Sequence, residues 1–438
     1  MNNTLKIVVL IGIMIGSIIG VAIAIPYIMI GVQTQNSNFL ESRLRSIFTA
    51  EKAEDLEGLF SAEFESAVPL DYLFFIINQI TTYYGDFENA SVSPRLEIFN
   101  VHSYTLNLEN SNTTGTIGFT PFTQEINSFW ISYFEFYPTY LKKINWSTIY
   151  DEYSDLPGNK SLLIAKNNEI VHSINTGDKL QVASTFKLYV LEALHEKIVN
   201  HSISLDTEIP ILDNYKSLPS GILHNEENGT LFTLKELADF MINISDNTAT
   251  DHLIYYLNRT YVESFLPSDY PFPLLTTAES FKLRWLINDS QLNSYLAMNE
   301  TEKRVFLDNN ISKLNVSDID LTSLNMTYNI DSRKSVEWTF NATDIYKIQN
   351  RTKYYNSTHL NPGLADPNDW KLVSFKGGSD VGVYSLAHSV QANNGTWFYC
   401  VIITNNYDEF QLDYGSYVAG EWGYSAICQK ILGKLSLE

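Results

Sequence analysis

Cysteine and basic side chains are scarce in this sequence. Only two cysteines, Cys400 and Cys428, occur in 438 residues, which excludes a disulfide framework and any cysteine-rich zinc or iron–sulfur site. The 29 lysines and arginines are outnumbered by 50 acidic residues, and the formal charge of −21 argues against nucleic acid as a partner. The eight histidines show no metal-binding spacing, so we expect no metal site and no cofactor.

The longest uncharged stretch of the chain, Ile7–Val32, could cross a hydrocarbon core of ~30 Å as a helix. Lys6 and the terminal amine precede it. They predict a cytoplasmic stub (residues 1–6), a transmembrane anchor (7–32) and the remainder on the extracellular or periplasm-equivalent face. The alternative is a cleaved signal peptide with a small-residue site at Ala22–Ala24, although the run exceeds the ~7–15 residues of a signal core.

Asn-x-Ser/Thr sequons are frequent, which favours an exterior location. The sequence holds 18 of them, among them Asn89, Asn145 and Asn228, whereas chance would give about six or seven. The alternative is that loops rich in Asn, Ser and Thr produce sequons that carry no sugar. We favour a glycosylated surface protein.

Residues 36–138 are predicted to form a small α+β domain. Apolar residues at helical spacing run from Phe39 to Tyr84, and alternating runs near 95–99, 104–108, 114–120 and 128–136 predict antiparallel strands. This order is similar to the cone-like fold of the nuclear transport factor 2, cystatin and ketosteroid isomerase type. We interpret its acidic and aromatic residues as solvated face and core, and the alternative is a pocket with its own function.

The segment Gln181–Leu191 begins a predicted helix with Ser184 and Lys187 three residues apart. Residues at this spacing share a helix face, so the Lys187 amine can reach the Ser184 hydroxyl, and the helix N-terminus adds N–H groups and positive dipole. A nucleophilic serine needs a local base and stabilised negative charge. Alone, Ser-x-x-Lys is a weak motif, because a capping serine beside a solvated lysine also matches it.

Two further motifs follow. Ser-Asp-Asn at Ser245–Asn247 lies on a predicted turn between the amphipathic segment Leu234–Ile244 and the predicted helix Ala249–Leu257. Lys-Gly-Gly at Lys376–Gly378 comes directly after the predicted strand Leu372–Phe375. Each tripeptide pattern would occur by chance about 0.2 times in such a chain, so all three motifs in this order argue against coincidence.

These three motifs in this order resemble the signature of class A β-lactamases and penicillin-recognising serine enzymes. The resemblance covers residues 145–438 and extends to the segments that flank the motifs: Pro219–Leu223, Asn247–Asp251, Trp397–Thr404 and Tyr424–Leu435. It implies an α/β sandwich plus an all-helical lobe, of the class A β-lactamase and transpeptidase type, with the site between them. It also implies a small-molecule acyl substrate, whereas the oligomeric state stays open.

The resemblance assigns the chemistry to three side chains. Ser184 would be the acylated nucleophile, Lys187 its base or proton relay, and Ser245 a second proton shuttle to the leaving group. Burial, the helix N-terminus and a second nearby cation would each lower the pKa of Lys187 from the usual ~10.4, which is how such a lysine becomes a base.

The resemblance also assigns substrate binding. Asn247 would bind a substrate amide and Lys376 would attract a substrate carboxylate. Gly378 and Ser379 would line the substrate site, and the oxyanion hole would be formed by the backbone N–H groups of Ser184 and Ser379.

The sequence departs from the family at two places. Gly377 replaces the usual hydroxyl residue between Lys376 and Gly378, and the Glu-x-x-Leu-Asn loop that carries the deacylating glutamate is not found. The segment most similar to that loop, Asp320–Asn325, differs from its spacing by one residue. A long helical insert runs from Leu274 to Met298 and beyond. This arrangement is similar to the subfamily of clavulanic-acid gene clusters, which places an isomerase-like domain before the hydrolase-like one.

Three functional hypotheses remain open. The first is a surface serine hydrolase that acts through an acyl-enzyme on a β-lactam, ester or amide. The second is a slow-turnover protein that is acylated and binds penicillins or sensor ligands. The third is an interaction module with an idle site, which the intact Ser184, Lys187 and Ser245 disfavour.

The two cysteines are expected to lie close together. Cys400 is on the predicted strand Trp397–Thr404 and Cys428 on the predicted helix Tyr424–Leu435, and in this fold that helix packs across that sheet. Either they form a disulfide, or both are small buried apolar residues.

Overall fold

The computed structural model describes residues 37–92, 101–120, 123–200, 202–319, 334–380, 382–407 and 414–438. The chain divides into two compact units, residues 1–157 with 412–438 and residues 158–411, and each unit has its own hydrophobic core. The anchor expected over residues 7–32 lies outside the described residues. Among the helices in the described ranges, none is long and apolar enough to span a membrane.

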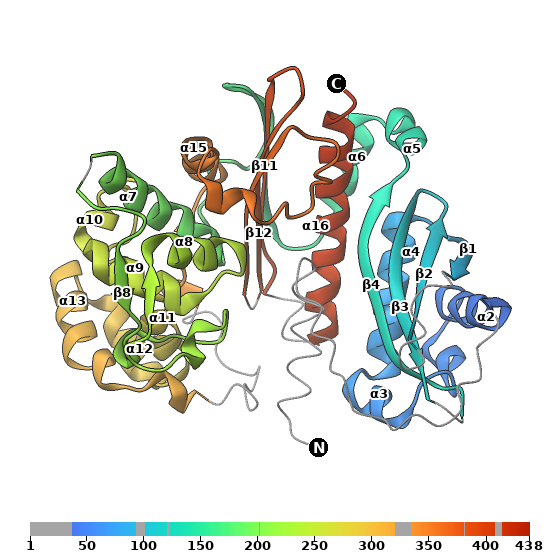
Figure 1. The fold of residues 1–438 in the computed structure, drawn as a ribbon, viewed down its shortest axis with the longest axis horizontal. Helices are drawn as coiled ribbons and strands as arrows, with labels where there is room; N and C mark the ends of the chain where they lie inside the picture. The colour runs from blue at the N-terminus through green and yellow to red at the C-terminus, as the bar shows by residue number, and fades with distance from the viewer. Residues whose placement is uncertain are drawn as a thin grey trace. The chain divides into compact units, whose positions relative to one another are not determined.

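The first unit contains a four-stranded antiparallel sheet in the order β1-β2-β3-β4 and seven helical segments among its described residues (Figure 1). Its strands are β1 (Phe87–Val92), β2 (Val101–Leu108), β3 (Ser111–Phe119) and β4 (Ile126–Phe136). Its helices are α2 (Ser37–Phe48), η1 (Ala53–Leu56), α3 (Ala62–Ala67), α4 (Leu70–Tyr84), α5 (Pro138–Lys143), α6 (Trp146–Asp155) and α16 (Tyr414–Leu435).

The strands of this sheet alternate between buried and more exposed side chains. Successive residues of β2 are half-buried and buried in strict turn, as expected of a strand with one face on the core. At Gly115 a Cβ would lie 2.2 Å from Trp130 O, so the close approach of β3 and β4 requires glycine. The strands expected near 104–108, 114–120 and 128–136 are confirmed, β1 was missed, and the run at 95–99 lies outside the described residues. The likeness to the nuclear transport factor 2 fold stays a prediction.

The C-terminal helix α16 packs against α4, α5, α6 and β4. Gln429 Nε2 donates to Phe134 O at 2.9 Å, Tyr84 OH donates to Gln429 Oε1 at 2.6 Å, and Lys430 pairs with Glu152 at 2.7 Å. The helix begins ten residues before the predicted start. The sequence assigned α6 and α16 to a domain over residues 145–438, and that assignment stays a prediction.

The second unit is built on a five-stranded antiparallel sheet in the order β11-β12-β13-β5-β6. Every residue of β13 is buried, so β13 is the centre of the sheet. The strands are β5 (Asn159–Lys166), β6 (Glu169–Ile174), β11 (Leu372–Asp380), β12 (Val383–Gln391) and β13 (Trp397–Asn405), and short pairs join β7 (Leu180–Gln181) to β10 (Thr339–Phe340) and β8 (Glu208–Pro210) to β9 (Leu231–Thr233).

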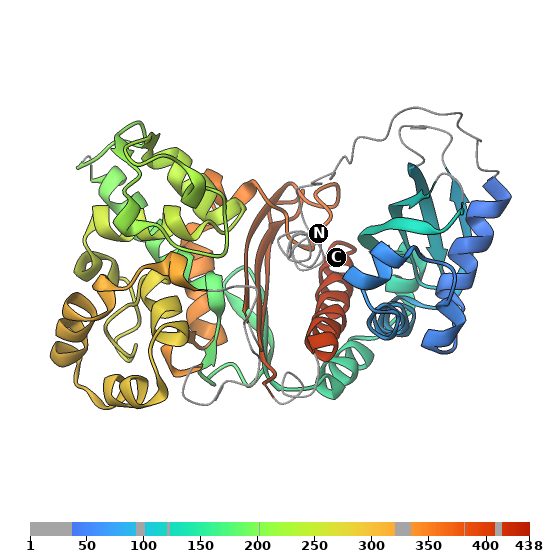
Figure 2. The same cartoon turned by 90° about the horizontal axis from the view of Figure 1, so that it is seen from below.

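Helices α7 to α13 gather on one side of this sheet, and α15 packs on β5, β12 and β13 (Figures 1 and 2). The α-helices are α7 (Lys187–Val199), α8 (Leu234–Asn243), α9 (Asn247–Leu257), α10 (Arg259–Glu263), α11 (Thr277–Trp285), α12 (Asp289–Ala297), α13 (Glu300–Asn309) and α15 (Ala342–Thr352). The 3-10 turns are η2 (Ala183–Phe186), η3 (Asp213–Tyr215), η4 (Leu223–Asn225), η5 (Ile311–Lys313), η6 (Val316–Asp318), η7 (Lys334–Val336) and η8 (Asn356–His359).

This unit has the sheet and the helical lobe that the sequence predicted. One detail was wrong: Lys376–Gly378 lies inside β11 and not after a strand. The helical insert expected after Leu274 is confirmed and consists of α11, α12 and α13. Cys400 and Cys428 are both buried, each in a different unit, and whether they form a disulfide stays a prediction.

Candidate active site

Ser184 lies on the turn η2, between β7 and α7. Its neighbour Ala183 has φ +44°, in the left-handed region that non-glycine residues rarely adopt. Val182 N donates to Trp338 O at 2.9 Å, and the rings of Phe186 and Trp338 stack with centroids 4.1 Å apart. These contacts hold a strained turn in place and leave Ser184 half-buried between buried neighbours.

Lys187 is the first residue of α7 and has no exposed surface. Its Nζ donates to Ser245 O at 2.6 Å, to Ser245 Oγ at 3.1 Å and to Asn247 Oδ1 at 2.7 Å. Burial lowers the pKa of Lys187 to about 7, although the charges of Asp246 and Asp251 act in the opposite direction. Near neutral pH a large share of this amine is therefore the neutral base that a proton acceptor must be.

The Ser-Asp-Asn turn is held by its aspartate. Ser245 has φ +58°, and the buried Asp246 caps α9 through Oδ1 while its Oδ2 accepts from Ile222 N at 2.7 Å. A Cβ at Gly221, which has φ +100°, would lie 2.1 Å from Asp246 Oδ2. The segment Pro219–Leu223, which the sequence singled out, is thus the support of this turn.

Asn247 is buried, and both ends of its amide are engaged. Its Oδ1 accepts from Lys187, and its Nδ2 donates to Leu218 O at 3.1 Å. Each end of the amide keeps further hydrogen-bonding capacity, and the predicted role of Asn247 in substrate binding stays a prediction.

Lys376 lies on β11, is 3% exposed, and donates to Ser245 Oγ at 3.1 Å and to Gly377 O. Burial lowers the pKa of Lys376, and the nearby charge of Lys187 lowers it further. Both amines contact the Ser245 hydroxyl, so they are at most about 6 Å apart, and two positive charges there would repel by about 3 kcal/mol at an effective dielectric constant of about 20. The arrangement favours one charged and one neutral amine.

Gly378 brings β11 against the nucleophile turn. A Cβ at this position would lie 2.3 Å from Val182 O and 2.7 Å from Ser184 N, which no side chain allows. Ser379 follows on the same strand and is exposed. The two backbone segments expected to form an oxyanion hole are therefore neighbours.

The structure brings the predicted site residues together. Hydrogen bonds join Lys187, Ser245, Asn247 and Lys376 into one buried network, and Ser184 borders it through η2. All of these residues lie in the second unit. Their individual chemical roles stay predictions.

The sequence missed the contribution of Asp251 and Thr277. Asp251 is buried and accepts from Thr277 N at 2.7 Å, Thr277 Oγ1 at 2.9 Å and Ala278 N at 2.9 Å, and burial raises its pKa to about 7. This side chain fixes the start of α11 beside the Ser-Asp-Asn turn, because Thr277 Oγ1 also lies 3.3 Å from Asn247 O. The signal in the sequence was the capping box Thr276-x-x-Glu279, which marks the start of α11.

The carboxylates that act on Lys187 within the described residues are Asp246 and Asp251. Both accept hydrogen bonds from backbone N–H groups, so both are committed to holding the fold. The segment Asp320–Asn325, the nearest echo of the deacylating loop, lies outside the described residues.

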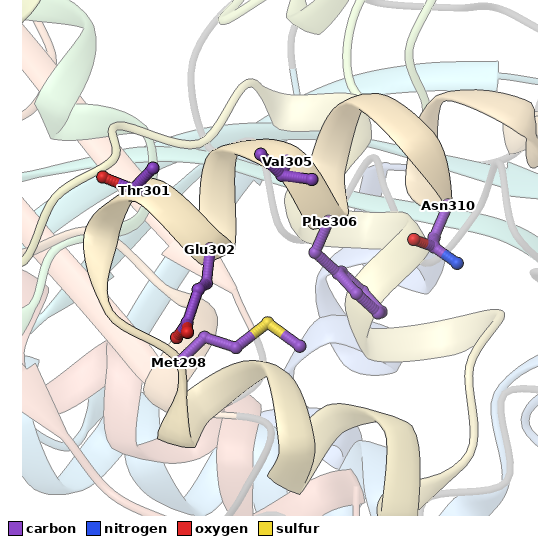
Figure 3. Close-up of a pocket in the computed structure, with 6 residues that line it drawn as sticks. All are labelled: Met298, Thr301, Glu302, Val305, Phe306 and Asn310. Carbon is purple, nitrogen blue, oxygen red and sulfur yellow. The ribbon is translucent and has the colours of Figure 1, made fainter.

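Neither a metal site nor the hollow beside α13 competes with this network among the described residues. Among the described residues, no group of three His, Cys, Asp or Glu side chains could hold a metal ion. The hollow in Figure 3 lies on α13 and the residues beside it, and it is lined by Met298, Thr301, Glu302, Val305, Phe306 and Asn310. Glu302 is already used in the capping box of α13, and no nucleophile with a base lies there, so this hollow is not the candidate site.

Comparisons with known proteins agree with the motifs. Residues 153–301 match the Beta-lactamase enzyme family, and this stretch includes Ser184, Lys187, Ser245 and Asn247. The predicted resemblance to serine enzymes of the β-lactamase type is confirmed over these residues. The likeness to the clavulanic-acid subfamily stays a prediction. No curated protein matches the chain in sequence.

Solved structures similar to the chain include β-lactamases and a penicillin-binding protein. The β-lactamase from Sphaerobacter thermophilus is 18% identical, covers 66% of this chain and 98% of its own, and has a TM-score of 0.45. A β-lactamase from Chitinophaga pinensis is 13% identical, covers 65% and 98%, and has a TM-score of 0.42. A mutant of PBP-A in an acyl-enzyme complex with penicillin G is 15% identical, covers 68% and 97%, and has a TM-score of 0.40.

The contact at Gly378 yields a prediction. Gly378→Ala should lower the free energy of unfolding by about 1–3 kcal/mol, because its Cβ would be forced against backbone atoms that cannot rotate away. Gly177→Ala is the matched control, since nothing lies within 4 Å of the added Cβ there. Urea unfolding of both variants measures the difference. Equal stability of the two variants would contradict the close approach of β11 to η2.

Proposed function

We propose that this chain is a serine hydrolase of the β-lactamase and penicillin-binding type that forms an acyl-enzyme on Ser184 with a β-lactam, ester or amide. The observation that carries the proposal is the buried network in which Lys187 and Lys376 share the hydroxyl of Ser245 beside the nucleophile turn. A lysine whose pKa falls to about 7 next to a serine on a strained turn is the arrangement that activates a nucleophile.

In the proposed reaction Ser184 Oγ attacks the substrate carbonyl carbon and its proton passes to the neutral Nζ of Lys187. The carbonyl oxygen becomes an oxyanion, which the N–H groups of Ser184 and Ser379 would stabilise. When the intermediate collapses, the carbon–nitrogen or carbon–oxygen bond breaks and the leaving group takes a proton from Ser245. Ser245 regains a proton from Lys187, so the acylation step is balanced. Water then releases the acyl group and restores Ser184.

A second function is favoured by one observation. Asp246 and Asp251, the carboxylates that act on Lys187 within the described residues, are both held by backbone N–H groups and have no freedom to activate water. A protein of this kind would be acylated readily and deacylated slowly, as a penicillin-binding or sensor protein is.

The decisive experiment is labelling with a fluorescent penicillin and with a fluorophosphonate, followed over hours. With the fluorescent penicillin, transient label with product release supports the hydrolase and persistent label supports the slow-turnover protein. The fluorophosphonate adduct does not turn over and reports only whether the serine is reactive, so absence of label from both probes supports the idle site. Ser184→Ala should keep the wild-type fold and lose labelling by ~10³-fold or more, because the acyl group has no oxygen to attach to. Stoichiometric labelling of this variant would contradict the assignment of Ser184 as the nucleophile.

Lys187 gives the reaction its pH dependence. The acylation rate of the wild-type chain should rise with pH through about 7 and level off above, since the neutral amine accepts the proton and burial holds its pKa there. Lys187→Arg should acylate about 10²-fold more slowly than the wild type above pH 7 and should lose the rise with pH, because a guanidinium does not deprotonate. Second-order labelling constants between pH 5 and 9 measure both effects. An Arg variant at the wild-type rate would move the base elsewhere.

We also propose that the chain is a glycosylated, membrane-anchored protein of the cell exterior. Of the 16 sequon asparagines within the described residues, 12 are exposed, four are half-buried and none is buried. At Asn258, Asn288 and Asn299 the side-chain oxygen caps a helix, which leaves Nδ2, the atom that carries a glycan, on the exposed side chain. The anchor itself rests on the sequence of residues 7–32.

The exposure pattern predicts which sequons carry sugar. Glycopeptide mass spectrometry of protein from a glycosylating host should find occupancy at exposed sites such as Asn145, Asn228 and Asn394, and none at Asn243. Asn243 is half-buried, its Oδ1 is enclosed, and it lies two residues before Ser245. Unmodified asparagines at all exposed sites would overturn the proposal, and the same protein after glycosidase treatment is the control.

A further inference from the structure

Arg284, Glu337 and Asp380 form a buried cluster next to the candidate site. Arg284 is on α11, Glu337 precedes β10, and Asp380 is the last residue of β11. Arg284 Nη1 lies 2.7 Å from Asp380 Oδ2 and 3.5 Å from Glu337 Oε1. The side chains of these residues are 6%, 15% and 2% exposed, respectively. One guanidinium nitrogen therefore joins two carboxyl groups that come from different parts of the second unit.

Glu337 is attached to the nucleophile turn through the residue that follows it. Trp338 O accepts from Val182 N at 2.9 Å, and the Trp338 ring stacks on Phe186. These two contacts bracket Ser184 along the chain. A displacement of Glu337 would therefore be passed to the backbone on both sides of the nucleophile.

Asp380 is attached to the opposite side of the expected oxyanion hole. It follows Ser379 directly, and Gly378 before them is the residue whose added Cβ would lie 2.7 Å from Ser184 N. The backbone of β11 and the backbone of η2 thus meet at Gly378. Asp380 anchors the end of β11 just beyond that meeting point.

The helix that carries Arg284 is also anchored at its other end. Asp251 binds Thr277 and Ala278 at the start of α11, next to the Ser-Asp-Asn turn. Helix α11 therefore extends from that turn to the cluster, and Arg284 lies within its last turn. Because α11 is anchored at its start, the Arg284 guanidinium is held in place and can bind the carboxyl groups of Glu337 and Asp380.

We propose that Arg284 is a positioning residue, which acts through Glu337 and Asp380 to fix the separation between the backbone N–H groups of Ser184 and Ser379. The inference rests on the proposed acylation of Ser184 and adds a group that does not touch substrate. A misplacement of 1 Å at a reacting centre can cost about 10²-fold in rate, so a clamp on these two segments has a measurable effect.

Stability alone does not account for this cluster. Arg284 Nε and Nη2 have no hydrogen-bond partner within the described residues, and a buried, incompletely satisfied ion cluster is often less stable than apolar packing. Burial and the charge of Asp380 raise the pKa of Glu337, against the effect of Arg284. Burial thus favours the protonated form of Glu337 beside the ion pair of Arg284 and Asp380.

The test compares two arginines of α10 and α11 that lie in partly buried ion pairs. Arg284→Met should lower the limiting acylation rate of Ser184 by about 30-fold and leave the half-saturating probe concentration within about threefold, because binding contacts stay and alignment is lost. Arg259→Met is the matched control: Arg259 pairs with Glu279 at 2.6 Å and contacts none of the site residues within the described ranges. Equal losses in both variants would show a general loss of stability and overturn the proposal.

A second pair of variants guards against misfolding of the methionine variant. Glu337→Gln should retain most of the wild-type acylation rate, because the amide has the shape of the carboxyl group and keeps an oxygen next to Arg284, whereas Glu337→Ala should lose about as much as Arg284→Met. Loss of activity in the glutamine variant equal to that in the alanine variant would contradict the proposed role of this oxygen next to Arg284. Full activity in both would overturn the clamp itself.

Hydrogen exchange separates this proposal from the proposed function. In Arg284→Met the amide of Val182 and the amides of residues 376–380 should exchange at least tenfold faster than in the wild type, and in Arg259→Met they should not. If the wild-type chain is never labelled, the proposed function fails while the exchange data still decide the clamp. If labelling succeeds and neither exchange nor rate changes in Arg284→Met, the clamp fails and the function stands.

Discussion

The ammonium group of Lys187 is enclosed by three hydrogen-bond acceptors, and none of the three is a carboxylate. Removing an ammonium from water costs several kcal/mol, and neutral acceptors return only part of that cost. The pKa of Lys187 therefore falls to about 7. The two nearby carboxyl groups could have reversed this result, but Asp246 and Asp251 are turned to backbone N–H groups instead. Lys187 can therefore lose its proton near pH 7 because the neighbouring carboxyl groups have other partners.

The second lysine, Lys376, determines where the hydroxyl proton of Ser245 can point. Ser245 Oγ lies 3.1 Å from Lys187 Nζ and 3.1 Å from Lys376 Nζ, and a hydroxyl group can donate only one hydrogen bond. When Lys376 carries the charge, it donates to Ser245, and the Ser245 proton is then free to point at the neutral Lys187 or at a leaving group. In the proposed reaction that charge on Lys376 would also attract a substrate carboxylate. Two buried lysines around one serine thus separate the base from the cation.

The sequence could predict the parts of this site that are local. The Ser-x-x-Lys spacing, the Ser-Asp-Asn turn and the lysine on a strand each follow from neighbouring residues, as do the capping boxes that begin α8, α11 and α13. The contacts between distant segments could not be predicted. Asp251 and Thr277 are 26 residues apart, Arg284 and Asp380 are 96 apart, and a buried polar side chain shows in the sequence only as one more polar residue. The early start of α16 was missed because its apolar pattern is weak before Tyr424.

Lys187 would serve both halves of the proposed reaction. Release of an acyl group requires a base for water, and within the described residues the carboxylates that act on Lys187 are bound to backbone donors. Thr277 Oγ1 lies near Asn247 and already contacts Asp251 and Ser217. Its hydroxyl group cannot serve as the base, because a hydroxyl group does not accept a proton from water at neutral pH. Lys187, once it has returned its proton through Ser245, has a pKa of about 7, which suits this role. Acylation and deacylation would then both depend on the titration of Lys187. The lifetime of the acyl-enzyme would be set by how well water can approach the acyl group, more than by the supply of a base.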